Sequence, residues 1–330
     1  MTSFSGSLLA GAVGDALGAS IEFESIDKIR ARYGPSGLTD YAPAYGKLGA
    51  ITDDTQMALF TLEGLVLARE RGLNPVESVH AAYLRWLSTQ GIQGPAANVP
   101  KDGWLLDHED IHDLRAPGNT CLVALRSGKA GTITNPLNDS KGCGAVMRAA
   151  PVALWSDDPA QVFALAAATG ALTHGHPSGY LSAGVLAVIV QQLLAGRQLR
   201  EAVATARAEL VLRPDHEEQL VLLDRAVNLA GTRPSPEFIE QNFGGGWVGE
   251  EALAIGLHAA LAARDLGDAL LLAVNHSGDS DSTGVIAGNI LGAVAGEQAI
   301  PRHWLERLEL RDAIAESARR AVAALTLVRG

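Results

Sequence analysis

Apolar residues recur along most of the chain at the three- to four-residue spacing of one face of an α-helix. Pro75, Pro159 and Pro177 each lie near the start of such a segment, where the missing N–H of proline costs little. No segment alternates apolar and polar residues for more than a few positions, as a half-buried strand would. The pattern predicts an all-α fold of a dozen or more helices, without a sheet of consequence. The clearest helical segments are SVHAAYLRWL, AQVFALAAATGAL, REAVATARAELVL, EQLVLLDRAVNLA and EALAIGLHAALAA.

Clusters of Gly, Pro, Asn and Asp separate these segments and predict long loops. Several of the loops exceed the usual connection length, and long ordered loops often carry function. No internal repeat and no low-complexity linker divides the chain, so residues 1–330 are expected to form one domain. The main loops are predicted at residues 33–49, 91–117, 135–144, 233–249 and 275–284.

The composition allows a large core and disfavours some partners. The chain has 330 residues, 47% of them hydrophobic, with a formal net charge of −11 and no basic cluster. General nucleic-acid binding calls for a positive face, and an anionic membrane would repel this chain. The most apolar stretch, residues 181–190, is too short to span a bilayer and is expected to be a buried core helix.

The two cysteines, Cys121 and Cys143, are expected to be reduced thiols rather than a disulfide framework. The first residues lack the basic start of a signal peptide, and Asp15 interrupts their apolar stretch. These features together predict a cytoplasmic protein.

Asp279 and Asp281 lie in the stretch HSGDSDSTG, directly before an apolar segment. Asp and Ser are common helix N-caps, and carboxylates are preferred ligands of magnesium and calcium. This stretch alone leaves both interpretations open. A calcium-binding EF-hand loop is excluded, because the residue at its twelfth position would be Ile290, which has no ligand atom.

A second acidic cluster, ITDDTQ, places Thr52, Asp53 and Asp54 before another apolar segment. Thr52 is a suitable N-cap, and the carboxylates suit the positive end of a helix dipole. Buried carboxylates are costly unless they are paired or bind a metal, and neither cluster contains Lys or Arg. If the two helix ends meet in space, four carboxylates and two hydroxyls would form a site suited to two hard metal ions.

Three further stretches carry candidate chemistry. GAVGDALGASIEF places Asp15 and Glu22 on or just after a helix of small residues, and its glycines do not match a dinucleotide-binding fingerprint. NDSKGCGAVMR is a glycine-containing loop that enters an apolar helix, which can bind phosphate through backbone N–H groups. Arg148 at its end is either a charge partner or a structural buried arginine. His174 and His176 are either metal or acid–base groups, or hydrogen-bonded loop residues.

In combination, these stretches resemble the ADP-ribosylglycohydrolase family, which includes dinitrogenase reductase-activating glycohydrolases and ADP-ribosylarginine hydrolases. The resemblance extends from about residue 6 to about residue 296. It implies a compact, orthogonal bundle of helices with two magnesium ions, which manganese can replace, in a central cleft. The stretches that follow the family's order are GAVGDALGASIEF, ITDDTQMAL, RAPGNTC, NDSKGCGAVMRAAP, LTHGHP, GGGWVGEEALAIGLHAAL and GDSDSTGVIAGNILGA.

The resemblance also implies roles for individual residues. Glu22 and Asp54 are the acids expected to be closest to the proton transfer. Many relatives carry Thr where this chain has Ser282, which retains the hydroxyl. Some carry an Asp three positions before Asn119, where this chain has Ala116, so a role of that acid does not carry over. The implied metal ligands are Thr52, Asp53, Asp54, Asp279, Asp281 and Ser282. The implied substrate contacts are Glu22, Asn119, Ser140, Lys141, Gly142, Cys143, Gly144 and His174.

The implied function is a hydrolase that releases ADP-ribose from modified proteins. SKGCGAVMRA and GDSDS look closer to the arginine-hydrolysing branch, and an acidic cleft would favour a guanidinium leaving group. We therefore expect cleavage of the N-glycosidic bond of ADP-ribosylarginine. The alternatives are an ADP-ribosylserine or other O-linked hydrolase, a non-catalytic ADP-ribose-binding module, and a two-metal phosphohydrolase. No heptad seam is visible, so a monomer is expected.

Overall fold

The computed structural model describes residues 2–92 and 101–326, and within these ranges the predicted all-α fold is confirmed. The described residues contain no strand, only the isolated bridges Ala44–Lys47 and Gly142–Val248. Residues 93–100, which belong to the predicted loop at 91–117, lie outside the described residues. The α-helices in chain order are α1 (Thr2–Gly18), α2 (Ile26–Tyr33), α3 (Asp53–Arg71), α4 (Pro75–Thr89), α5 (Asn119–Arg126), α6 (Pro159–Ala171), α7 (Pro177–Leu194), α8 (Leu199–Leu210), α9 (Glu217–Asn228), α10 (Pro236–Phe243), α11 (Gly249–Ala262), α12 (Leu266–Val274), α13 (Ser280–Ala295), α14 (Arg302–Leu305) and α15 (Arg311–Thr326).

The prolines mark helix starts as predicted. Pro75, Pro159 and Pro177 are the first residues of α4, α6 and α7. The residue before each proline caps the helix, because its side chain accepts a hydrogen bond from a backbone N–H of the first turn. A backbone N–H at this position would have no partner within the helix, so proline, which lacks it, costs little there. The residues at each start therefore specify where the helix begins.

Three predicted loop boundaries were wrong. The loop expected at residues 233–249 contains α10, whose two buried residues, Ile239 and Phe243, are too few to produce a clear periodic pattern. The loop expected at 275–284 ends where α13 begins at Ser280. The loop at 135–144 leads into the short 3-10 helices η4 (Cys143–Ala145) and η5 (Ala150–Leu154) rather than an apolar α-helix.

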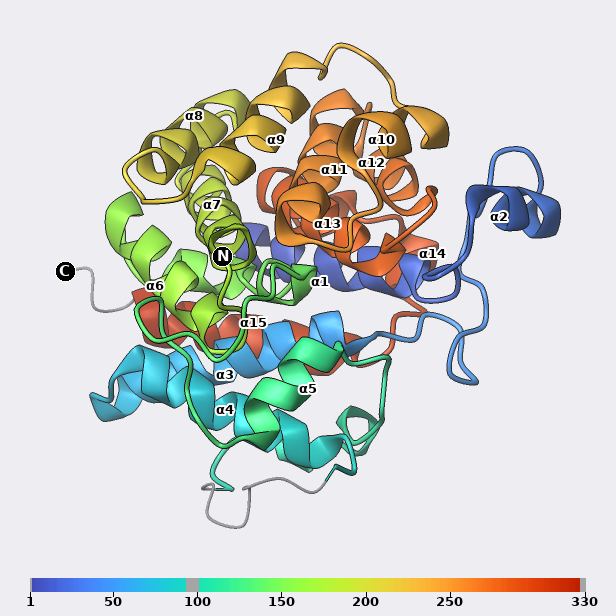
Figure 1. The fold of residues 1–330 in the computed structure, drawn as a ribbon. Helices are drawn as coiled ribbons and strands as arrows, with labels where there is room; N and C mark the ends of the chain where they lie inside the picture. Colours follow the sequence, from blue (N-terminus) through green and yellow to red (C-terminus); the bar gives the residue numbers. More distant parts are fainter. Residues whose placement is uncertain (1, 93–100, 327–330) are drawn as a thin grey trace.

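Helix α7 contains the apolar stretch 181–190 and is a core helix, as predicted. It is the one helix of the described part of the chain that is long and apolar enough to cross a membrane, with 18 residues and a mean hydropathy of 1.3. The helix is longer than residues 181–190, the apolar stretch identified in the sequence. However, 83% of it is buried inside the protein, where it packs against α6, α8 and α13 (Figure 1).

Helices α1 and α13, from opposite ends of the chain, form the most extensive helix contact in the structure. In Figure 1 they lie side by side in the middle of the molecule, one in blue and the other in orange-red. Glycines bring the two backbones together: a Cβ on Gly14 would lie 2.1 Å from the carbonyl oxygen of Gly284, and one on Gly288 would lie 2.2 Å from that of Ala10. The same packing continues to Gly18, where a Cβ would lie 2.3 Å from the backbone nitrogen of Asp281. The contact therefore sets the position of the first turn of α13.

Asp15 joins α1 to the start of α3. Its carboxylate is completely buried and accepts hydrogen bonds from the backbone N–H groups of Thr52 and Thr55 and from the Thr55 hydroxyl. Three donors offset much of the cost of burying one carboxylate. Through α1, the N-terminal ends of α3 and α13 are thus held in fixed relative positions.

The α1–α13 packing predicts that Gly288→Ala destabilises the protein by about 1–3 kcal/mol, since overpacking outweighs the better helix propensity of alanine. Urea unfolding followed by circular dichroism would measure this change. Gly231→Ala is the control, because a Cβ at Gly231 would meet no atom within 4 Å. Equal stability of the two variants would show that the contact is not tight.

Candidate active site

An open cleft of about 360 Å³ lies where the N-terminal ends of α3 and α13 meet. Most of the residues implicated by the sequence line it, together with residues 116–121 and the 3-10 helix η4. Thr52, Ser140 and Lys141 do not line it. The implicated residues that do are Glu22, Asp53, Asp54, Asn119, Gly142, Cys143, Gly144, His174, Asp279, Asp281 and Ser282.

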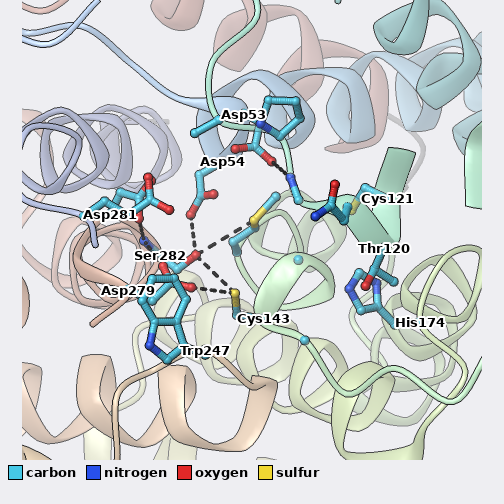
Figure 2. A pocket seen from close by; sticks show the side chains of 18 of the residues that line it. Asp53, Asp54, Thr120, Cys121, Cys143, His174, Trp247, Asp279, Asp281 and Ser282 are labelled. Atoms are coloured by element: carbon cyan, nitrogen blue, oxygen red, sulfur yellow. Dashed lines mark hydrogen bonds between the residues drawn. The ribbon is translucent and has the colours of Figure 1, made fainter. Parts of the chain in front are cut away.

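The two acidic clusters are brought into direct contact. The Ser282 hydroxyl, at the start of α13, donates to Oδ2 of Asp54, at the start of α3, over 2.8 Å (Figure 2). Thr52 and Asp279 are the N-caps of these helices, and each accepts a hydrogen bond from a backbone N–H of the first turn. The same helix ends are therefore capped and carry carboxylates into the cleft.

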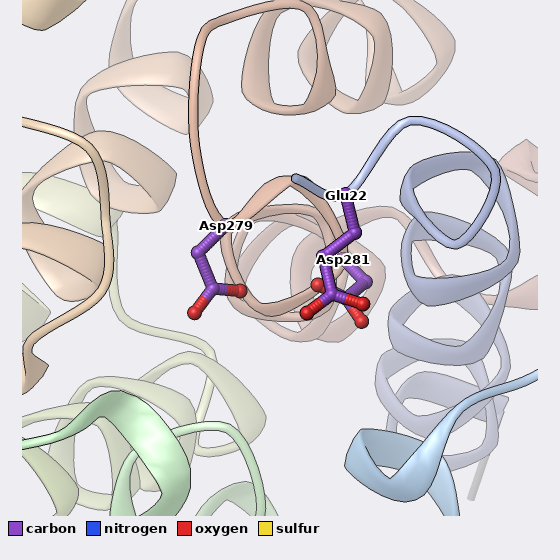
Figure 3. Close-up of side chains that lie close together, drawn as sticks. All are labelled: Glu22, Asp279 and Asp281. Carbon is purple, nitrogen blue, oxygen red and sulfur yellow. The ribbon is translucent and has the colours of Figure 1, made fainter. Parts of the chain in front are cut away.

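Glu22 adds a fifth carboxylate from the turn after α1. One carboxylate oxygen from each of Glu22, Asp279 and Asp281 lies within 4.8 Å of the other two. Figure 3 shows the three side chains pointing into the same space. Oε2 of Glu22 is buried and makes no hydrogen bond within the described part of the chain.

Burial and mutual repulsion disfavour the charged form of these acids. Burial raises the pKa of Asp53, Asp54 and Asp279, and repulsion from Asp281 raises each pKa further. Burial, followed by repulsion from Asp281 and Asp279, also raises the pKa of Glu22. Across residues 2–92 and 101–326, no Lys or Arg forms an ion pair with any of the five acids. The charge must be neutralised by protons or by bound cations.

The donor set fits a hard divalent cation. Carboxylate and hydroxyl oxygens converge, and oxygen ligands are what magnesium and manganese prefer. A bound ion would also give the free Oε2 of Glu22 a partner. Sγ of Cys143 donates to Oδ2 of Asp279 at 2.8 Å, and burial raises the pKa of this thiol. Cys143 is therefore a neutral donor to the cluster.

Three implicated residues do not line the cleft. The Thr52 side chain caps α3 and is fully buried. The Ser140 hydroxyl is 3.0 Å from that of Thr120, which does line the cleft. Nζ of Lys141 forms ion pairs with Glu218 and with Glu250. The charge of Lys141 is thus already compensated outside the cleft.

The cleft is also lined by residues that the sequence analysis did not identify as site residues. Phe23 and Trp247 stack at its mouth with ring centroids 5.4 Å apart and planes at 19°, and both are substantially exposed. Phe23 has a positive φ of 68°, which is unusual for an aromatic residue. Thr120, Cys121 and Met147 complete the wall. Trp247 follows three glycines. An aromatic residue in a glycine-rich loop was the sequence signal that could have identified it as a cleft residue.

A family model described as ADP-ribosylglycohydrolase matches residues 2–329. The chain belongs to the ADP-ribosylglycohydrolase family. This confirms the resemblance seen in the sequence and supports glycohydrolase activity. The acidic cleft is the candidate active site of this ADP-ribosylglycohydrolase.

Named relatives align over nearly the whole chain. It is 27% identical to the ADP-ribosyl-[dinitrogen reductase] glycohydrolase of Rhodospirillum rubrum, over 98% of this chain and 96% of that protein. It is also 27% identical to the ADP-ribosylarginine hydrolase Tri1 of Serratia proteamaculans (strain 568), over 95% of this chain and 77% of that protein. A solved structure titled ADP-ribosylglycohydrolase-related protein complex superposes with a TM-score of 0.70 at 25% identity, covering 98% of both chains.

The repulsion in the cluster predicts that bound metal and removal of one carboxylate each stabilise the protein. Magnesium or manganese at about 100 times its dissociation constant should stabilise the ADP-ribosylglycohydrolase by about 2.7 kcal/mol, and chelator should reverse this. Asp281→Asn should raise the melting temperature of the chelated protein, because it removes a buried like charge, and should weaken the response to metal. Thermal unfolding with chelator and with each metal would measure both effects.

Asp312→Asn is the matched control, because this aspartate on α15 is exposed and does not line the cleft. It should leave both the chelated stability and the metal response unchanged. A full metal response in Asp281→Asn would contradict the assignment of this carboxylate to the metal site.

Proposed function

We propose that this ADP-ribosylglycohydrolase is a magnesium-dependent enzyme that hydrolyses the N-glycosidic bond of ADP-ribosylarginine in modified proteins. The observation that carries the proposal is the meeting of five carboxylates in one cleft without a compensating Lys or Arg in the described residues. Such a cluster is suited to two divalent cations and, through them, to a substrate rich in hydroxyl and phosphate oxygens. Manganese should be able to replace magnesium.

The two sides of the cleft suit different parts of the substrate. The acids lie on the side formed by α3 and α13, and η4 with His174 forms another side (Figure 2). Gly144 lacks a side chain that would otherwise crowd His174, and Gly142 beside it also has none, so a ligand can approach the backbone there. In the proposed complex, the scissile ribose lies at the acids and the diphosphate lies along residues 142–144.

The chain's own acids can move the protons that hydrolysis requires. Asp53, Asp54, Asp279, Asp281 and Ser282 would hold the ions, which supply Lewis-acid polarisation and an activated water when bound. A water oxygen forms a bond to C1 of the ribose as the bond from C1 to the guanidinium nitrogen breaks. One proton leaves the water and one joins the departing nitrogen. We assign this transfer to Glu22, whose Oε2 is free and whose raised pKa makes the protonated form accessible.

Asp54 is the second acid near the reacting group. Its Oδ2 accepts from the Ser282 hydroxyl, which fixes the carboxylate in the cleft. We propose that Asp54 chiefly holds metal and that Glu22 carries the proton.

The cleft mouth favours arginine as the acceptor. A guanidinium is planar and cationic, and it binds well over aromatic faces beside negative charge. Phe23 and Trp247 present such faces next to Glu22. The Serratia proteamaculans relative is named an ADP-ribosylarginine hydrolase, which agrees with this choice.

Paired substrates test the linkage. An ADP-ribosylarginine peptide and an ADP-ribosylserine peptide, each supplied with magnesium, should differ, with free ADP-ribose released from the arginine peptide. Chromatography would quantify the product. Release from the serine peptide alone would replace the proposed substrate by the O-linked alternative. Binding of ADP-ribose without release from either peptide would indicate a binding module, and release of AMP or phosphate would indicate a phosphohydrolase.

Glu22→Gln should lower kcat by about 10²- to 10⁴-fold, because the amide cannot transfer the proton. Binding of ADP-ribose should change much less, since the side-chain shape is kept. Glu24→Gln is the control, because Glu24 lies two residues further on and pairs with Lys28 and Arg32 outside the cleft. Unchanged kcat in Glu22→Gln would remove Glu22 from the mechanism.

A further inference from the structure

Arg148 is a buried cation that forms no ion pair with any carboxylate in the part of the chain described. It is 1% exposed, and its guanidinium carbon lies 4.3 Å from the centroid of the Tyr83 ring. Nη1 contacts Sδ of Met57 and Sγ of Cys121, both at 3.4 Å. A buried charge among neutral groups is costly. Its hydrogen bond to Thr173 is therefore informative: Nη2 donates to Oγ1 of Thr173 over 2.7 Å.

The Thr173 hydroxyl connects this guanidinium to His174. Oγ1 of Thr173 lies 2.8 Å from Nδ1 of His174. A guanidinium can only donate, so the hydroxyl oxygen accepts from Arg148 and keeps its own hydrogen for another acceptor. Sγ of Cys121 also lies near this hydroxyl, but a thiol sulfur is a much weaker acceptor than an imidazole nitrogen. The hydrogen therefore goes to Nδ1 of His174.

Charges on both sides of the imidazole favour the same tautomer. The guanidinium lies on the Nδ1 side and disfavours a proton there, whereas the carboxylates of Asp53 and Asp279 lie across the cleft. The imidazole is buried, and the backbone of Gly144 lies close to it, because a Cβ added there would be 2.9 Å from Cε1 of His174. Burial, with a contribution from Arg148, lowers the pKa of His174 to about 3, so the ring is neutral.

We propose that Arg148 is a positioning residue, which acts through the Thr173 hydroxyl to hold His174 as the neutral tautomer with its proton on Nε2. The cleft thereby gains a fixed N–H donor that carries no positive charge. Such a donor suits an oxygen acceptor, such as a ribose hydroxyl or a phosphate oxygen. The tautomer stands independently of the proposed function, whereas its use in binding ADP-ribose rests on that function.

The tautomer can be observed directly in the 15N-labelled protein by long-range proton–nitrogen correlation spectra. His174→Asn identifies the signals of this ring. In the unmodified protein Nδ1 should be unprotonated and Nε2 protonated. Thr173→Val should produce a mixture of both tautomers, whereas Thr173→Ser should retain the original one, since only serine keeps the hydroxyl. A proton on Nδ1 in the unmodified protein, or an unchanged ring in Thr173→Val, would overturn the proposal.

Arg148 itself is tested by Arg148→Met, which keeps much of the buried volume and removes the donor and the charge. It should also shift the ring toward a mixture of tautomers. A folded Arg148→Met protein with an unchanged tautomer would exclude the arginine from this role. If this variant does not fold, Arg148→Lys, which keeps the charge but not the geometry of Nη2, takes its place and should give an intermediate mixture. If the His174 tautomer were unchanged in both Arg148→Lys and Thr173→Val, the proposed connection from Arg148 through Thr173 to His174 would be rejected.

The binding consequence is measured separately by calorimetry with ADP-ribose and magnesium. Thr173→Val should weaken binding by about threefold to tenfold, the effect of one hydrogen bond, and Thr173→Ser should not. Equal affinity in the two variants would show that His174 Nε2 does not contact the ligand. Absence of binding by the unmodified protein, with the tautomer as expected, would reject the proposed function and leave the positioning role intact.

Discussion

Repulsion among the carboxylates at one end of the cleft is the constraint on which the rest of the structure depends. Asp53, Asp54, Asp279 and Asp281 would separate if their helices were free to move. The glycine contacts between α1 and α13, and the hydrogen bonds that the start of α3 donates to the Asp15 carboxylate, prevent this movement. Favourable packing in the scaffold offsets the unfavourable repulsion among these charges, which is a common property of metal-binding and catalytic sites.

The cleft keeps positive side chains away from these acids. Lys141 is next to the glycine loop in sequence, but it pairs with Glu218 and Glu250. Arg148 is close to the cleft, but its guanidinium faces neutral groups and reaches the cleft only through Thr173 and His174. An arginine that paired directly with the cluster would compete with bound cations. The neutral imidazole supplies a hydrogen bond to a ligand without that competition.

Local signals in the sequence were sufficient for much of the fold and for the main site residues. The helical spacing, the prolines at helix starts, and the caps at Thr52 and Asp279 depend on residues near one another in the chain. The ion pairs of Lys141 and the stacking of Phe23 on Trp247 depend on residues far apart in sequence, so no local pattern contains them. The short helix α10 was missed because its burial rests on few apolar side chains.

The contact between α1 and α13 also has a consequence for the order of folding. It joins residues near positions 14 and 284, so it closes almost the whole chain into one loop. Contacts between such distant residues form late, because their entropy cost must be met by structure already present. The acids of α3 and α13 therefore remain apart while the chain is being synthesised. A growing chain thus carries its acidic residues in separate, solvated segments, and the charged centre forms only as the first and last thirds of the protein dock.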